Sequence, residues 1–214
     1  MPSWAAMVPT NETGMGAIFD LDFDPIEPGT QNIDIRFSPE LEYVNASLVE
    51  IDDTGEWSML TSANLVPDSS IVEMFFVEEI NWCGSAGPAA IGCGSQGGNT
   101  IAIEIASATE GDFGTVLYSH ELGHNLDLEH DGTADNLMRG TINTANMDLT
   151  STQIETIWLD IPGIIQFDAD LDQNFIQITP IVVVAASTIP LPSALLLCVG
   201  AIGAVGVFVR RTET

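Results

Sequence analysis

The sequence predicts an α+β fold, in an α/β layered arrangement, in which helices pack on a mixed, twisted β-sheet. Several short segments alternate apolar and polar residues with the period of two that is typical of strands. A later segment, from Asp112 to His124, places apolar residues three and four apart, as an amphipathic helix does. Strands and a helix that covers them form a layered domain. The 214 residues suffice for one such domain with appendages.

Four segments are predicted strands. The first two and the last alternate apolar side chains with polar or acidic ones, and the third is rich in Val, Ile and Phe, which favours burial. They are residues 17–24, 32–37, 71–80 and 99–106. Residues 41–51 are ambiguous, with β-branched residues that favour extended chain. Residues 56–65 fit a short helix that ends before Pro67.

The charge of the chain excludes several classes of partner. The chain has 31 acidic residues against four arginines and no lysine, a formal net charge of -27. Such a surface repels nucleic acid and anionic lipid, and it suits a soluble exported protein or salty surroundings. The apolar share of 45% is enough for a core, so the chain is not a disordered acidic polymer.

Two acidic segments offer oxygen ligands for calcium, but neither completes a coordination sphere. Asp20, Asp22 and Asp24 share one face of the predicted strand 17–24, which is typical of a solvated face. The second segment begins like an EF-hand loop at Asp168, but Gln173 and Thr179 occupy the positions of the glycine and the glutamate. Calcium is therefore an alternative to a solvated surface, and residues 166–188 are interpreted as an acidic linker.

Cysteine usage predicts one disulfide. Cys83 and Cys93 bracket a Gly- and Ala-rich loop whose composition lets its ends meet, and the bond would require an oxidising compartment. The alternative is a pair of free thiols, because pairing is not readable from spacing alone.

All three histidines of the chain fall in the eleven residues from His120 to His130. His120 and His124 are four apart, so a helix presents both on one face to a single metal ion. Glu121 lies beside them, placed to take a proton from an activated water. A chance cluster of core or surface histidines is the less favoured interpretation, and the pattern predicts one zinc ion bound by His120, His124 and His130.

The predicted helix delivers these ligands. Asp112 is the predicted N-cap, and Phe113, Val116 and Leu117 continue the stripe on which His120 lies. The helix must end soon after His124, because His130 reaches the same ion only if the chain turns back.

The stretch resembles the metzincin metallopeptidases, whose signature is His-Glu-x-x-His-x-x-Gly-x-x-His followed by a turn that contains methionine. His120, Glu121, His124 and His130 match, whereas Asp127 stands where the family has glycine. That glycine permits positive φ, a region that aspartate enters more easily than most residues. By resemblance, Met138 in the stretch from 135 to 140 is the structural methionine beneath the histidines. No tyrosine ligand follows Met138.

The resemblance implies a metzincin-like catalytic domain over residues 31–165, with its C-terminal helix after a capping box at Thr150 and Gln153. The family opens with a strand and a long helix. No long helical pattern precedes residue 31, so residues 1–30 are expected to be an N-terminal segment that is truncated upstream, and no signal peptide is visible there.

These parts imply an exported zinc endopeptidase in which three neutral imidazoles hold zinc and Glu121 is the general base. Its substrates would be proteins or peptides, and it is expected to be a monomer. A different class of function is a non-catalytic, zinc-binding acidic surface or matrix protein. A third interpretation replaces His130 by a distant glutamate, for which Glu155 is the candidate.

The last residues predict a membrane segment. Residues 191–209 carry no charge and are followed by Arg210 and Arg211, as expected of a transmembrane helix with its C-terminal end in the cytoplasm. With Pro190 and Pro192, the layout of residues 189–214 resembles a PEP-CTERM sorting signal in a Pro-Leu-Pro variant. Such signals belong to exported bacterial proteins processed by exosortases. The resemblance therefore implies a cell-surface or extracellular location, a membrane contact and an exosortase-like partner.

Overall fold

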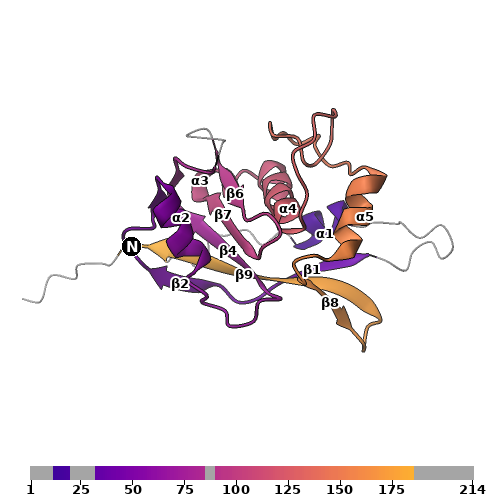
Figure 1. Cartoon of the computed structure of the whole chain (residues 1–214), viewed down its shortest axis with the longest axis horizontal. Coiled ribbons are helices and arrows are strands. Elements are labelled where there is room, and N and C mark those ends of the chain that lie inside the picture. Colours follow the sequence, from indigo (N-terminus) through magenta and orange to yellow (C-terminus); the bar gives the residue numbers. More distant parts are fainter. Residues whose placement is uncertain (1–11, 20–31, 85–89, 186–214) are drawn as a thin grey trace, which may run out of the picture.

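The structure, a computed structural model, describes residues 12–19, 32–84 and 90–185 (Figure 1). In these ranges the chain forms a seven-stranded sheet, a two-stranded sheet and five helices. The helices are α1 (Glu12–Ile18), α2 (Thr54–Thr61), α3 (Ile105–Ala108), α4 (Asp112–Asn125) and α5 (Ser151–Leu159). The strands are β1 (Ile33–Phe37), β2 (Leu41–Val44), β3 (Glu50–Ile51), β4 (Val72–Val77), β5 (Glu79–Ile80), β6 (Gly92–Gly94), β7 (Thr100–Glu104), β8 (Ile165–Asp168) and β9 (Gln173–Val184). The predicted class, helices on a mixed sheet, is confirmed.

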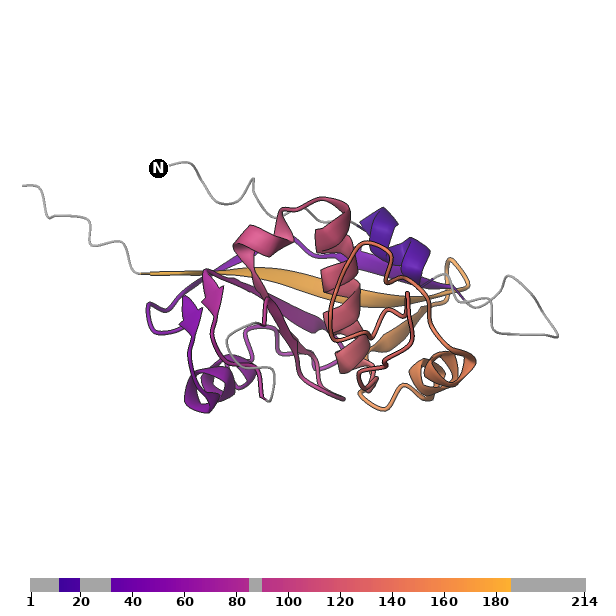
Figure 2. The same ribbon diagram turned by 90° about the horizontal axis from the view of Figure 1, so that it is seen from above.

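The twelve-residue strand β9 is the centre of the large sheet, whose order is β1-β9-β4-β7-β6. It runs along the long axis of the molecule (Figure 2). One edge of β9 pairs in parallel with β1 and then with β2, and the other pairs with β8 and then with β4. Strand β6 pairs antiparallel with β7, and β8 pairs antiparallel with β9, which makes the sheet mixed.

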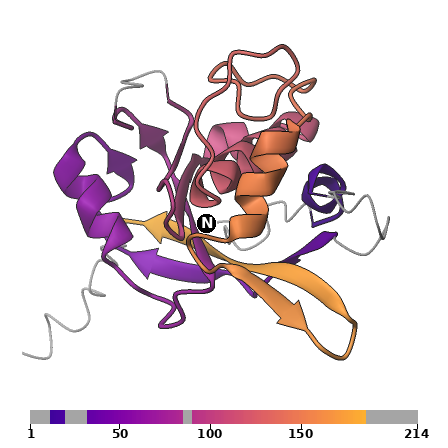
Figure 3. The same cartoon turned by 45° about the vertical axis from the view of Figure 1, so that its right-hand side comes forward.

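Alternation along the strands divides the core into two layers. In β4, Met74 and Phe76 face α1, α4 and α5, whereas Phe75 and Val77 face α2 and the small β3–β5 sheet. This is the period of two expected of a strand that is buried on both faces. Figure 3 shows α2 and α4 on opposite sides of the sheet.

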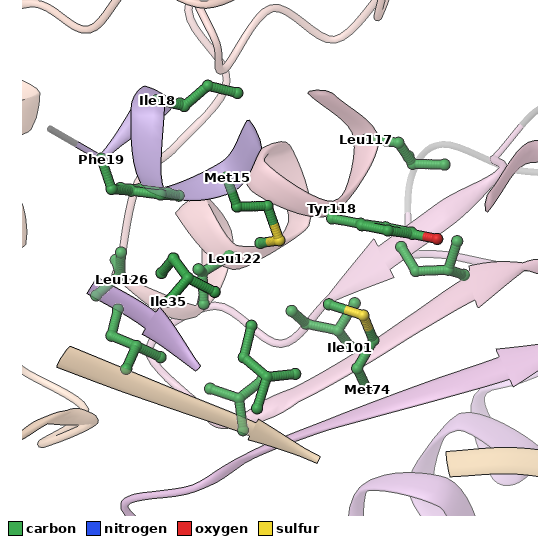
Figure 4. Close-up of a cluster of buried hydrophobic side chains, with 14 of the residues drawn as sticks. Met15, Ile18, Phe19, Ile35, Met74, Ile101, Leu117, Tyr118, Leu122 and Leu126 are labelled. Atoms are coloured by element: carbon green, nitrogen blue, oxygen red, sulfur yellow. The ribbon is translucent and has the colours of Figure 1, made fainter. Parts of the chain in front are cut away.

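The larger layer holds α4 in place. Met15 and Phe19 of the α1 segment lie beside Leu122 and Leu126, and Tyr118 lies above Met74 and Ile101 (Figure 4). The residues that form this part of the core are all buried: Met15, Phe19, Ile35, Met74, Ile101, Tyr118, Leu122 and Leu126. Helix α4 therefore rests on the middle of the sheet through a continuous apolar contact.

Three of the four predicted strands are confirmed, and one is wrong. Residues 32–37, 71–80 and 99–106 contain β1, β4 with β5, and β7, although Ile105 and Ala106 at the end of the last range belong to helix α3. Residues 17 and 18, predicted as the start of a strand, belong to helix α1, because Met15, Ile18 and Phe19 have the three-and-four spacing that packs a helix on α4. The acidic residues Asp20, Asp22 and Asp24, with the calcium alternative that rests on them, lie outside the described residues.

The interpretation of residues 166–188 as a linker is wrong for residues 166–184, and residues 186–188 lie outside the described residues. Residues 165–168 and 173–184 form β8 and the central strand β9, joined by a turn at Asp172 with φ 51°. The layered domain therefore extends to Val184, beyond the predicted boundary at 165.

The predicted transmembrane helix, residues 191–209, and the sorting residues Pro190, Pro192, Arg210 and Arg211 lie outside the described residues. Among the helices that the structure does describe, none has the length and apolar character needed to cross a membrane.

Candidate metal centre

Helix α4 presents two of the ligands with their orientation already fixed. His120 is buried and its Nδ1–H donates to the carbonyl of Leu137 at 2.7 Å, while the Nδ1–H of His124 donates to the carbonyl of Leu128 at 2.8 Å. A backbone carbonyl only accepts, so it selects the tautomer that protonates Nδ1. Both rings therefore keep an unprotonated Nε2, the atom that a metal ion needs.

The third imidazole meets these two. The Nε2 atoms of His124 and His130 are 3.2 Å apart, and one ligand nitrogen from each of the three histidines lies within 4.8 Å of the others. Two nitrogens on one tetrahedral zinc ion, at 2.0–2.1 Å each, are about 3.3 Å apart. The three histidines predicted from spacing are thus brought together as a group that can hold a metal ion.

A Schellman turn ends α4 and sends the chain back towards the metal ligands. Asp127 has φ 65°, and its N–H donates to the carbonyl of His124 while the N–H of Leu128 donates to that of Gly123. This is the hydrogen-bond pattern of the motif, in which the left-handed residue is usually glycine. Asp127 therefore adopts the positive φ expected at this position, and the turn brings the Leu128 carbonyl to His124.

Glu121 is buried against the edge strand β6. Burial raises its pKa to about 8, although the backbone N–H of Gly94 donates to its carboxylate and acts in the opposite sense. A Cβ on Gly92 would lie 2.5 Å from the Glu121 carboxylate, and a Cβ on Gly94 would lie 2.5 Å from the Glu121 carbonyl oxygen. The two glycines therefore let β6 approach the helix closely enough to shield the carboxylate.

Burial also keeps His120 neutral. It lowers the pKa of His120 to about 4; the bond to Leu137 opposes this, and the charges of His124 and His130 add to it. Burial likewise lowers the pKa of His124. At neutral pH both rings are therefore in the form that binds a metal ion.

Met138 packs against helix α4 between its two histidines. It is fully buried, and a Cβ on Gly123, between the two helical histidines, would collide with the Met138 sulfur. The N–H of Asp131, next to His130, donates to the carbonyl of Met138 at 2.8 Å. Met138 thus joins the backbone of α4 to the chain that carries the third histidine.

The predicted disulfide between Cys83 and Cys93 is present. Cys93 is the middle residue of β6, between the two glycines that contact Glu121. The bond therefore anchors the edge strand beside the carboxylate.

Helix α4 is capped one residue earlier than predicted. Gly111 is the N-cap, with φ 59°, and Asp112 is the first helical residue, where its charge still favours the helix dipole. The capping box of α5 is confirmed: the Thr150 side chain accepts from the Gln153 N–H, and the Gln153 side chain bonds back to Thr150.

Sequence reasoning missed the buried amides that surround the site. Asn125 donates from Nδ2 to the carbonyls of Ser95 and Thr100, which attaches the loop after β6 to the end of α4. Asn136 and Gln153 pair behind Met138. Their signal in the sequence is faint, because an amide side chain in a loop is usually exposed. Glu155, the alternative ligand, is exposed on α5 and does not belong to the histidine group.

Comparison of the chain with protein-family models, with curated proteins and with solved structures gives no match. The chemistry of the site therefore has to be inferred from its own geometry.

Proposed function

We propose that this protein is an exported zinc-dependent endopeptidase of metzincin type, with His120, His124 and His130 as the metal ligands and Glu121 as the general base. The observation that carries the proposal is the convergence of three imidazoles next to a desolvated carboxylate. A purely structural metal site has no use for a buried carboxylate that is not a ligand.

The donor set fits zinc. Three neutral imidazoles with Nδ1 held by carbonyls are ligands that zinc accepts, and three protein ligands leave one position of a tetrahedral ion for water or substrate. Carboxylate-preferring ions such as calcium and magnesium find no oxygen ligand within this histidine group.

Zinc in such a site supplies Lewis-acid activation of a water molecule and of the carbonyl that the water attacks. The residues of the chain do the rest. Glu121, aligned by the N–H of Gly94 and shielded by β6, accepts the proton of the attacking water and returns it to the leaving amine. Without a metal ion, burial would keep the Glu121 carboxyl mostly protonated at neutral pH, with a pKa of about 8. A bound cation would lower that pKa, which would leave the carboxylate free to accept the proton. Met138 and the Schellman turn at Asp127 keep the three rings in position.

Export is part of the proposal. The Cys83–Cys93 disulfide is a bond that persists in oxidising compartments, and a chain with a net charge of -27 stays soluble outside the cell. The sorting signal at residues 189–214, its membrane helix and its exosortase-like processing enzyme remain proposals that rest on sequence alone.

Glu121→Gln separates hydrolysis from metal binding. The amide keeps the shape of the side chain but cannot accept the proton, so we expect cleavage of casein or a peptide library to fall by at least about a thousandfold. Zinc content, measured by elemental analysis after dialysis, should stay at one ion per chain. Wild-type protein that binds zinc but cleaves nothing would favour the non-catalytic surface or matrix protein instead. Retained activity in Glu121→Gln would exclude this carboxylate as the base.

A further inference from the structure

The loop beneath the metal ligands is held by a buried amide pair. Asn136 donates from Nδ2 to Oε1 of Gln153 at 2.8 Å, and Gln153 donates from Nε2 to Oδ1 of Asn136 at 3.1 Å. Asn136 is 2% exposed and Gln153 is 9% exposed. In this pair each amide group donates one hydrogen bond to the other and accepts one from it. Hydrogen bonds depend on direction, so the pair fixes the orientation of both side chains more strictly than apolar packing would.

The amide pair fixes the backbone on both sides of Leu137. The same Oδ1 of Asn136 accepts from the N–H of Met138 at 2.8 Å, and Asn146 donates from Nδ2 to the Asn136 carbonyl at 2.9 Å. The N–H of Leu137 itself donates to the carbonyl of Asp148 at 2.7 Å. The peptide groups before and after Leu137 therefore have set orientations, which leaves the Leu137 carbonyl one direction in which to point.

That carbonyl is the group that orients His120. It accepts from Nδ1–H of His120 at 2.7 Å, which sets both the tautomer and the rotation of the ring. We propose that Asn136 and Gln153, with Asn146, are positioning residues that set the metal affinity of the site by holding the Leu137 carbonyl against His120. The inference rests on the proposed function only in taking His120 as a metal ligand.

The position of Gln153 links the site to α5. Its Oε1 also accepts from the N–H of Thr150, as the second half of the capping box. The same side chain therefore caps the N-terminus of α5 and binds Asn136 in the loop. Thr150 contributes the other half of the box through its hydroxyl, which accepts from the Gln153 N–H and also donates to Oε1 of Gln153 at 3.2 Å, but it is not a member of the amide pair. The two halves allow the stability of α5 to be separated from the support of His120.

The test compares Gln153→Met with Thr150→Ala in the full chain. Both remove part of the capping box, but only Gln153→Met breaks the amide pair. We expect Gln153→Met to raise the zinc Kd about tenfold, the lower end of what loss of an outer-shell partner costs, while Thr150→Ala stays within about twofold. Zinc Kd is measured by competition with a chromophoric chelator, and the unfolding midpoint of each variant is measured in urea.

A second readout needs no metal. In the zinc-free protein the Nδ1 proton of His120 should exchange slowly in wild type and in Thr150→Ala, and measurably faster in Gln153→Met, by nitrogen-edited NMR. If Gln153→Met does not fold, Asn146→Ala is used instead, because it removes the bond to the Asn136 carbonyl and leaves α5 unchanged. Asn146→Ala should likewise raise the zinc Kd and speed the exchange of the His120 Nδ1 proton.

The outcomes separate this inference from the proposed function. Equal zinc Kd and equal His120 exchange in Gln153→Met and Thr150→Ala would overturn the positioning role, whatever the wild type cleaves. A wild type that binds zinc without cleaving peptides would overturn the proposed hydrolysis alone. A wild type that binds no zinc would overturn the metal site, and the His120 exchange rates would then decide whether the amide pair orients the ring.

Discussion

Asp127 carries a backbone strain that the metal site requires. It occupies the left-handed position of the Schellman turn, which a residue with a side chain enters at a cost, less for aspartate than for most. We expect Asp127→Ala to lower the free energy of unfolding by about 1 kcal/mol and Asp127→Gly to leave it nearly unchanged, because glycine relieves strain but gains entropy in the unfolded chain. Urea denaturation with the disulfide intact measures both.

A matched control for this change is Asp172, which has φ 51° in the turn between β8 and β9, a turn that contributes none of the metal-ligand histidines. Asp172→Ala should cost a similar amount of stability but leave zinc affinity unchanged, whereas Asp127→Ala should weaken both. Zinc affinity that is equal in the two alanine variants would mean that the turn does not position His130.

Glu73 gives a dependence on pH that is independent of the metal ligands. It is buried in β4, where its carboxylate accepts from the N–H groups of Val66 and Leu65, and burial raises its pKa above the ordinary 4.5. Below pH 4.5 the group is protonated in both the folded and the unfolded state. As pH rises from there through the raised pKa, the folded state holds the proton longer than the unfolded state does, so the free energy of unfolding falls.

Glu73→Gln keeps an oxygen acceptor and removes the titration. The stability of the variant relative to wild type should therefore be higher at about pH 7 than at about pH 4, by thermal or urea unfolding at the two pH values. An equal stability difference between Glu73→Gln and wild type at the two pH values would show that folding does not raise the pKa of Glu73.

The candidate metal ligands could be predicted from the sequence at the residue scale, and the side chains that support them could not. Three histidines in eleven residues, with a glutamate after the first, form a pattern that only a metal site explains well. Asn136 gives no comparable signal, because its partner Gln153 is seventeen residues away and the pairing exists only once the loop is folded. Short-range spacing specifies ligands on one helix, whereas long-range amide contacts depend on tertiary structure.

At the scale of elements, β6 lies so close to α4 that two of its three residues, Gly92 and Gly94, have no room for a side chain. A Cβ on Gly94 would meet the Glu121 carbonyl at 2.5 Å and the Cβ of His124 at 2.9 Å, both on a helix that cannot move away from the sheet. We expect Gly94→Ala to lower stability by roughly 1–3 kcal/mol and to expose Glu121, which would reduce hydrolysis. Gly132→Ala is the matched control, because nothing lies within 4 Å of its added Cβ.

Urea unfolding and peptide cleavage are measured on both glycine variants. A Gly94→Ala protein with the stability and activity of Gly132→Ala would mean that β6 has room to shift, and that close contact with β6 does not shield the carboxylate.

Strand β9 falls within the predicted acidic linker, and its sequence contains a proline in the interior of the strand. Pro180 argues against a central strand, since proline has no N–H for a ladder bond. On one edge, however, β1 pairs with residues 174–178 and β2 with residues 181–184, so the edge is interrupted beside Pro180. The carbonyl of Ile178 accepts from Ser38 on that edge, and alternation turns the nitrogen of Pro180 to the same side. The missing N–H therefore falls in the gap and costs no bond.

Across the whole molecule, β9 joins parts of the chain that are far apart in sequence. It pairs with β1 and β2 near the start of the described chain and with β4 and β8, so the sheet has no continuous centre without it. A chain ending at Asp168 should lose cooperative unfolding and zinc binding together, whereas one ending at Ala185 should keep both. Circular dichroism and chelator competition measure the two properties. Zinc binding that survives removal of β9 would mean that α4 and its loop fold independently of the sheet.

The central position of β9 also sets the order of events during synthesis. The helix with the histidines leaves the ribosome about fifty residues before the strand that completes the sheet beneath it, and pairings between such distant segments form slowly. The nascent chain therefore carries the three histidines and Glu121 without a rigid site for them until residue 184 has emerged. If the protein is the exported peptidase proposed above, it would be inactive while it is being made and would gain activity only in the compartment in which it folds.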